Sequence, residues 1–225
     1  MDSLSVAWWL RPRYGVTVDY GQLPATAEIA ASAEICRCLS IEHITVKVDC
    51  RQLGSGDMAG AEPSRHAPES DWWPYRNQML VTFAAMRTIG LGVTRLLLGT
   101  VKSDEVHRDG SPAFVEAMSS LLSMQEGGMT VGAPAIHLST LELIRSAEVP
   151  PEILAFAHSC HKTEVACGNC VSDRGRPSCR NPAFLARQGR DRYGDCRRLI
   201  SGSTSSMTDP SAMTWARPAS RRCSS

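Results

Sequence analysis

The chain has 225 residues, of which 43% are hydrophobic and 21% charged, so one packed core is expected and wholesale disorder is excluded. A net charge of +1 excludes a nucleic-acid binder that relies on strong overall positive charge. No apolar run approaches the roughly 18 residues of a membrane span, and the first ten residues lack the features of a signal peptide. We therefore expect a cytoplasmic protein with reduced thiols.

Helices and strands are predicted to alternate along the first 157 residues. Apolar periodicity predicts helices at 4–10, 25–39, 78–89, 112–125 and 138–147, with Asp2 and Ser3 as caps of the first. Strands are predicted at 14–19, 44–48 and 95–98, with a short one at 153–157. Residues 50–71 are rich in Gly, Pro and Ser and predict a loop. This order predicts an α/β fold with a parallel sheet and helices on both faces. No strand leads into the first helix.

The charge is distributed unevenly along the chain. Residues 174–225 contain 11 arginines and three aspartates but no lysine or glutamate, whereas the residues before them are acidic overall. Apolar periodicity also ends there, and such a composition is typical of a disordered basic tail. The sequence thus divides into an α/β domain at 1–150, a cysteine-containing segment at 151–173 and the tail at 174–225.

Polar residues follow the first predicted strand. Ligands of open α/β sheets bind beyond the carboxyl ends of the strands, so this position makes four residues candidates for ligand binding: Asp19, Tyr20, Gly21 and Gln22. A polar turn that only ends the strand is an equal alternative.

Arg76 and Asn77 directly precede the predicted helix at 78–89. The first turn of a helix favours anions through its free N–H groups and its dipole, and arginine suits phosphate. The alternative is a solvated arginine beside a capping asparagine.

Carboxylates follow the third predicted strand. Gly99 begins a polar segment in which Asp104 and Asp109 could hold Mg²⁺ through phosphate or bind a polar substrate. His107 lies between them, as an exposed loop residue or as a functional one.

Three closely spaced cysteines, Cys160, Cys167 and Cys170, predict a metal site. The Cys-Gly-Asn-Cys turn at 167–170 lets two thiolates converge on zinc, which favours metal over a disulfide. The fourth ligand is open among Asp173, Cys179, His158 and His161. Cys36, Cys38 and Cys50 are expected to pack in the core instead.

In this order the motifs resemble the 7-cyano-7-deazaguanine synthase family, relatives of the N-type ATP pyrophosphatases. The resemblance covers residues 1–170 and rests on VDYGQ at 18–22, PYRNQ at 74–78, LGTVKSDEVHRDG at 98–110 and the cysteines SC…CGNC at 159–170. Met1-Asp2-Ser3 is similar to the end of the family's phosphate-binding Ser-Gly-Gly-x-Asp-Ser loop. On this resemblance the chain begins inside that loop, and the first strand of the fold is missing.

The resemblance implies a Rossmann-like fold of the adenine nucleotide alpha hydrolase type, with a small zinc lobe at its carboxyl end. It implies that ATP activates the carboxylate of 7-carboxy-7-deazaguanine and that ammonia then yields an amide and finally the nitrile. ATP and Mg²⁺ would be bound by residues at the strand ends, and Zn²⁺ by Cys160, Cys167 and Cys170. No side-chain nucleophile is required. A homodimer is a further implication, and membrane or nucleic-acid partners are not expected. The candidate residues for ATP and Mg²⁺ are Asp2, Ser3, Asp19, Tyr20, Gly21, Gln22, Arg76, Asn77, Gly99 and Asp104.

Three interpretations of the whole chain remain open at this point. The first is an ATP-dependent ligase of deazapurine synthesis, which without the glycines of the loop would bind ATP poorly. The second is a non-catalytic nucleotide- or base-binding relative whose basic tail contacts nucleic acid or a protein. The third is a zinc-stabilised α/β domain with unrelated chemistry. The change in composition and the loss of periodicity that follow Cys170 are explained either by a reading-frame shift or by a true basic tail.

Overall fold

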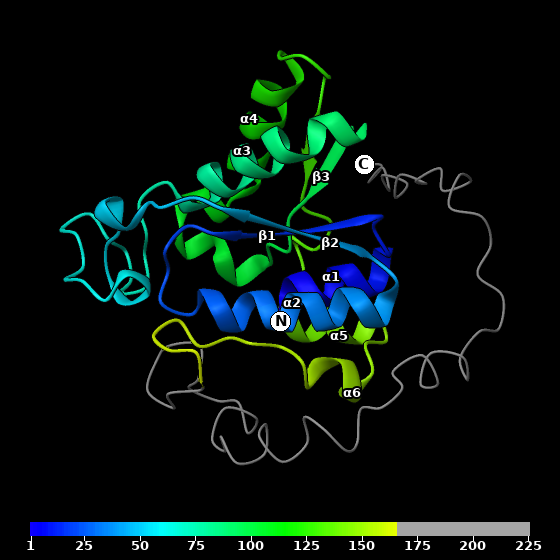
Figure 1. Ribbon diagram of the computed structural model, residues 1–225, viewed down its shortest axis with the longest axis horizontal. Coiled ribbons are helices and arrows are strands. Elements are labelled where there is room, and N and C mark those ends of the chain that lie inside the picture. The colour runs from blue at the N-terminus through cyan, green and yellow to red at the C-terminus, as the bar shows by residue number, and fades with distance from the viewer. Residues whose placement is uncertain (166–225) are drawn as a thin grey trace, which may run out of the picture. The chain divides into compact units, whose positions relative to one another are not determined.

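The computed structural model describes residues 1–165. Its longer elements alternate as the sequence predicts (Figure 1). The helices are α1 (Asp2–Leu10), α2 (Ala25–Leu39), α3 (Arg76–Thr88), α4 (Pro112–Ser123), α5 (Thr140–Ser146) and α6 (Pro151–Leu154). The strands are β1 (Tyr14–Asp19), β2 (Glu42–Lys47), β3 (Arg95–Leu97) and β4 (Thr130–Gly132). The α/β class is therefore confirmed.

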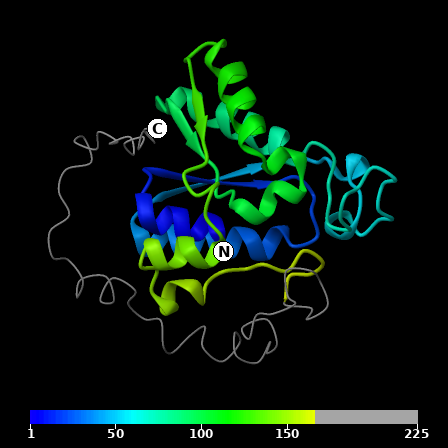
Figure 2. The same ribbon diagram turned by 180° about the vertical axis from the view of Figure 1, so that it is seen from behind.

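The strands β1 and β2 form a parallel pair that is six residues long, from Tyr14↔Glu42 to Asp19↔Lys47. The helix α2 packs so closely on β1 that a Cβ at Gly15 would lie 2.7 Å from Cys36 Sγ. Met79, Leu80 and Phe83 of α3 pack in a cluster with Val18 and Trp73. Helices thus cover both faces of this pair, with α1 and α2 on one side and α3 on the other (Figures 1 and 2).

The second parallel pair, β3 with β4, is only three residues long. Its core is formed with apolar side chains of α3 and α4, namely Val81, Val115, Met118 and Leu122 around Leu96 and Val131. The strand β4 was missed in the sequence, because three residues that follow Gly127 and Gly128 are too few to display a period of two.

The single continuous sheet expected from the sequence is not what the described residues form. The pairs β1–β2 and β3–β4 are separate two-stranded sheets, and a cavity lined by both β1 and β3 lies between them. Within residues 1–165, no strand joins these two sheets.

Two local predictions are wrong. The strand expected at 153–157 is the short helix α6, because Pro151 stands at its first turn, where proline is well tolerated. Asp2 and Ser3 do not cap α1: the cap residue is Met1, and Asp2 is the acidic residue of the first turn. The helix therefore begins earlier than the apolar pattern indicates.

The three cysteines expected in the core, Cys36, Cys38 and Cys50, are all buried. Cys36 and Cys50 are free thiols. None of the helices within residues 1–165 is long and apolar enough to cross a membrane.

Candidate functional site

A cavity of about 740 Å³ opens where β1 and β3 face each other. Residues from α1, α2, α3, the segment after β3 and the segment 156–161 complete its walls. Seven of the ten residues predicted to bind ATP or Mg²⁺ line it: Asp2, Ser3, Tyr20, Arg76, Asn77, Gly99 and Asp104. The topology thus brings together residues that are up to 102 positions apart in the sequence.

The start of α1 lies against the end of β3. Gly99 allows this contact, since a Cβ there would clash with the backbone and the hydroxyl of Ser3. The neighbouring Asp2 has a buried Oδ1 atom without a hydrogen-bond partner in the described residues. A buried carboxylate oxygen without a partner is costly, so this atom is suited to a cation or a donor supplied by a ligand.

Arg76 is the first residue of α3, and it follows Tyr75, which holds a left-handed conformation at φ 55°. The Arg76 guanidinium lies 3.0 Å from the sulfur of Met58. Among residues 1–165 it forms no ion pair with a carboxylate within 4 Å. A half-buried guanidinium at a helix N-terminus whose neighbour is a thioether is suited to bind an anion.

Tyr20 lines the cavity as a buried aromatic group. Its ring makes an edge-to-face contact with Trp73 at a centroid distance of 4.8 Å, and its hydroxyl lies 3.8 Å from Met58 Sδ. Burial raises the pKa of this phenol well above its usual value, so Tyr20 stays neutral and does not supply a charge to the site.

The segment after β3 is folded around Asp104. Its carboxylate accepts a hydrogen bond from Val101 N at 2.9 Å, and burial raises its pKa above the ordinary value. The turn that follows is tied to α3, because Asn77 donates from its backbone N to Asp109 Oδ2 at 3.2 Å and from Nδ2 to Asp109 O at 2.9 Å. Asn77 and Asp109 therefore bind to each other and hold Arg76 beside this segment.

The Asp71 carboxylate lies between the imidazoles of His107 and His161. Asp71 Oδ2 is 3.1 Å from His161 Nδ1, and Asp71 Oδ1 is 3.6 Å from His107 Nε2. The two imidazoles, which line the cavity, hold the pKa of Asp71 far below its usual range. In return the carboxylate raises the pKa of His107 above its ordinary value.

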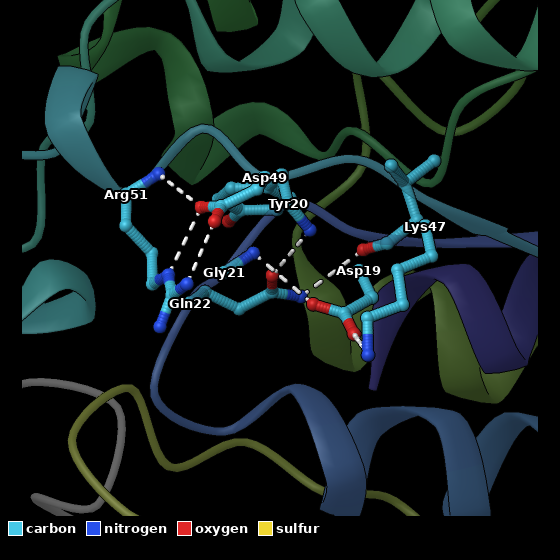
Figure 3. Close-up of polar contacts among 8 residues, drawn as sticks. Asp19, Tyr20, Gly21, Gln22, Lys47, Asp49 and Arg51 are labelled. Atoms are coloured by element: carbon cyan, nitrogen blue, oxygen red, sulfur yellow. Dashed lines mark hydrogen bonds and ion pairs between the residues drawn. The ribbon is translucent and has the colours of Figure 1, made fainter.

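The other three predicted residues, Asp19, Gly21 and Gln22, form a turn outside the cavity lining (Figure 3). Gln22 is buried, and its amide binds Tyr20 N at 2.9 Å, Val18 O at 3.1 Å and Glu28 Oε2 at 2.8 Å. Asp19 accepts from Gly21 N at 3.1 Å, and a positive φ of 94° explains the glycine. These groups therefore form hydrogen bonds within the turn and to the residues next to it. Their role in ligand binding stays a prediction.

Arg51 and Asp49 continue this self-contained turn. Their side chains form a two-pronged contact at 2.9 and 2.6 Å, which lowers the pKa of Asp49 to about 2. A Cβ at Gly21 would clash with the Arg51 side chain, so the pair packs directly against the turn.

Of the predicted zinc ligands, Cys160 is buried and its sulfur lies 3.5 Å from Thr163 Oγ1. Cys167 and Cys170 lie outside the described residues, as do Asp173 and Cys179. Within residues 1–165, no three His, Cys, Asp or Glu side chains gather as a metal site would require.

Three residues were missed as parts of the site: Met58, which lines the cavity, Asp71, which contacts two lining histidines, and Trp73, which contacts Tyr20. All three lie in or next to the 50–71 segment, which lacks periodicity and was predicted as a loop. The two adjacent tryptophans before Pro74 were a usable signal, because an aromatic residue as buried as Trp73 must have a packed surface to cover.

The fold and the cavity define an α/β protein with a cavity lined by two parallel strands and the segments that follow them. The family model described as "Queuosine biosynthesis protein QueC" matches residues 1–184, and the chain belongs to this family.

Three curated relatives, each named 7-cyano-7-deazaguanine synthase, are similar to the chain. The relative from Desulforudis audaxviator is 30% identical over 178 residues, which cover 71% of this chain and 80% of the relative. The one from Nitrosococcus oceani is 30% identical over 179 residues and covers 72% and 79%. The one from Methanosarcina barkeri is 26% identical over 179 residues and covers 70% and 78%.

Proposed function

We propose that this chain is an ATP-dependent enzyme that converts 7-carboxy-7-deazaguanine and ammonia into 7-cyano-7-deazaguanine, a precursor of queuosine. Its membership of the family and the names of its relatives support the reaction. The single structural observation that carries the proposal is the cavity lined by β1 and β3, which gathers seven of the ten residues that the sequence pattern predicts to bind ATP or Mg²⁺.

The reaction needs an activated carboxylate. The substrate carboxylate attacks ATP and releases pyrophosphate, and ammonia then displaces AMP to form the amide. A second ATP activates the amide oxygen, again with release of pyrophosphate, and elimination of AMP carries that oxygen away and leaves the nitrile. Because the substrate supplies its own nucleophile, the protein has to align two anions and reduce their repulsion. Arg76 at the start of α3 is the residue best placed to do so, since it lines the cavity without a carboxylate partner in the described residues.

Asp2 and Asp104 are the proposed positions for Mg²⁺. Both line the cavity, and the buried Asp2 Oδ1 without a partner fits an oxygen ligand of a hard cation. Magnesium is held in many phosphate sites by one or two carboxylates together with the phosphates themselves. When bound, the ion would screen the phosphate charges, while Ser3 and Gly99 would lie at the same end of the cavity.

Zinc remains a proposal for Cys160, Cys167 and Cys170. What supports it is the spacing of these cysteines, together with the position of Cys160 directly beside His161, which contacts Asp71 at the cavity. A homodimer and a small-molecule substrate without membrane or nucleic-acid partners belong to the same proposal.

The direct test combines the purified chain with ATP, Mg²⁺, ammonia and 7-carboxy-7-deazaguanine, and detects the nitrile by mass spectrometry. The Arg76→Met variant should form it at least about tenfold more slowly, because a charge-assisted contact to an anion is lost. Arg87→Met is the matched control, since Arg87 is exposed in the last turn of the same helix, and it should retain the rate. Failure of the wild-type chain to form any amide or nitrile would contradict the proposal.

A further inference from the structure

The side chain of Glu28 lines the cavity, and only one of its two carboxylate oxygens is engaged. Glu28 lies in the first turn of α2 and belongs to the cavity wall. Its Oε2 atom accepts a hydrogen bond from Gln22 Nε2 at 2.8 Å. Among residues 1–165, no other side-chain hydrogen bond or ion pair involves this carboxylate. Its Oε1 atom is therefore available to a donor that enters the cavity.

The amide of Gln22 fixes the orientation of this carboxylate. Gln22 Oε1 accepts from Tyr20 N at 2.9 Å, and Gln22 Nε2 donates to Val18 O at 3.1 Å as well as to Glu28. With its acceptor and both amide hydrogens in use, the Gln22 side chain cannot rotate without losing partners. The turn after β1 thus needs no ligand of its own, but it holds a residue of the following helix whose second oxygen is unused.

The wall around Glu28 is suited to a flat ring. Residues three, four and seven positions further along α2 lie on the same helix face as Glu28, and they line the cavity with it: Ala31, Ser32 and Ile35. The strand β1 adds Val16. Small and aliphatic side chains pack well on an aromatic ring system, and one polar group among them can fix its orientation. This part of the cavity therefore differs from the polar part that follows β3.

Glu28 shares the cavity with the cation Arg76. The two residues come from helices on opposite faces of the β1–β2 pair, α2 and α3, and both line the cavity (Figures 1 and 2). The Tyr20 phenol responds to both charges, since Arg76 lowers its pKa and Glu28 raises it. The cavity thus presents one anionic and one cationic side chain near the same phenol, and neither of them forms an ion pair with a described residue.

We propose that Glu28 recognises the base of the substrate through its N1–H and 2-amino groups, while Arg76 binds the substrate carboxylate. The inference rests on the proposed function, whose substrate has these two adjacent donors on its six-membered ring and the carboxylate on its five-membered ring. The two oxygens of a carboxylate have about four acceptor positions, so Glu28 can accept from the base and from Gln22 together. The sequence pattern did not single out Glu28.

This chemistry selects a guanine-type base over adenine. Adenine places its 6-amino donor beside N1, which is an acceptor and would meet the carboxylate with a lone pair. A site that is built to accept hydrogen bonds rejects an analogue that lacks the donors, because its buried polar group is then left without a partner. Glu28 would therefore favour the substrate base over the adenine of ATP.

The test is calorimetric titration of the wild-type chain and Glu28→Gln with three ligands: 7-carboxy-7-deazaguanine, its analogue without the 2-amino group, and its 2-oxo analogue. In the variant, the amide oxygen keeps the hydrogen bond from Gln22 and an NH₂ group replaces the free acceptor. Glu28→Gln should bind 7-carboxy-7-deazaguanine at least about tenfold more weakly. It should bind the 2-oxo analogue, which has an acceptor at position 2, more tightly than the wild type does.

Two controls separate base recognition from other roles. Glu34→Gln changes a carboxylate of the same helix that pairs with Arg37 and lies outside the cavity lining, and it should keep the wild-type affinities. ATP with Mg²⁺ should bind Glu28→Gln as it binds the wild type, which a carboxylate that held the cation would not allow. A damaged fold, which circular dichroism detects, would weaken all ligands alike and could not reverse the preference at position 2.

The wild-type chain alone already decides part of the question. If it binds the analogue without the 2-amino group as tightly as 7-carboxy-7-deazaguanine, the inference is overturned while the proposed function stands. The same holds if Glu28→Gln keeps the wild-type preference among the three ligands, or if it weakens ATP and the substrate equally. If the wild-type chain neither binds 7-carboxy-7-deazaguanine nor forms the nitrile, the proposed function fails, and this inference fails with it.

Discussion

The carboxyl ends of β1 and β3 use their polar groups in opposite ways. After β1, the amide of Gln22 and the carboxylate of Asp19 bind the backbone of their own turn (Figure 3). Around the end of β3, polar groups remain without a protein partner in the described residues: His107 Nδ1 in the segment after the strand, and Asp2 Oδ1 at the start of α1, which lies against it. The first turn is complete without a ligand, whereas the second retains unused donors and acceptors around a cavity.

The difference shows how polar groups that stabilise a turn can be distinguished from polar groups that are available to a ligand. Both ends satisfy the rule that ligands of α/β sheets bind beyond the strands, and both carry polar side chains. Hydrogen-bond satisfaction distinguishes them, because a buried group that is already paired has little to offer a ligand. We therefore propose that the ligand binds at the β3 end, and the following predictions test that proposal.

The largest effect is expected at Gly99. Gly99→Ala should lower the free energy of unfolding by about 3 kcal/mol, because the added methyl group overpacks the contact with Ser3. Chemical denaturation measures the change. Gly90→Ala is the control, since a Cβ there meets no atom within 4 Å and should alter stability by less than about 0.5 kcal/mol. Equal stability of the two variants would show that α1 does not begin against β3.

The next effect concerns Gln22. Gln22→Ala should cost about 2 kcal/mol of unfolding free energy, because Tyr20 N, Val18 O and Glu28 lose the amide that joins them. Gln78→Ala, at an exposed position of α3, should be nearly neutral in the same denaturation experiment. An unchanged stability of Gln22→Ala would mean that the β1 turn is not closed on itself.

The smallest effect should depend on pH. Asp71→Asn should lower the free energy of unfolding by about 1–2 kcal/mol, because a half-buried charge-assisted pair is lost. The depressed pKa of Asp71 makes its contribution present above the ordinary value of 3.8 and lost in acid. Because the pKa of His107 is raised, the stabilisation that the Asp71–His107 pair gives to the folded chain is present below pH 6.5 and is lost as the pH rises through the raised pKa. The difference from wild type should therefore be largest between about pH 4 and 6.5.

Denaturation at a series of pH values measures this difference. Asp49→Asn is a suitable control, since its pair with Arg51 is exposed to solvent and screened. A difference between Asp71→Asn and wild type that does not vary from pH 3 to 9 would contradict the ion pair.

The elements β1 and α2 match their predicted bounds because both are long enough to repeat their hydrophobic pattern. The strand β4 and the helix α6 were missed or misassigned because three or four residues carry no period. Seven of the ten candidate ligand residues line one cavity, because strand ends and helix starts are visible in the sequence pattern; their role in binding stays a prediction. Asp71 could not be found, since the partner of a loop carboxylate is set by tertiary packing.

The measurement that tests the central claim most directly is ATP binding by calorimetry, with Arg76→Met compared with Gln22→Ala at a temperature where both variants are folded. We predict that Arg76→Met loses at least about tenfold in affinity, while Gln22→Ala binds as the wild type does. Loss of binding in Gln22→Ala with retention in Arg76→Met would place the ligand at the β1 turn and contradict the assignment to the β3 end.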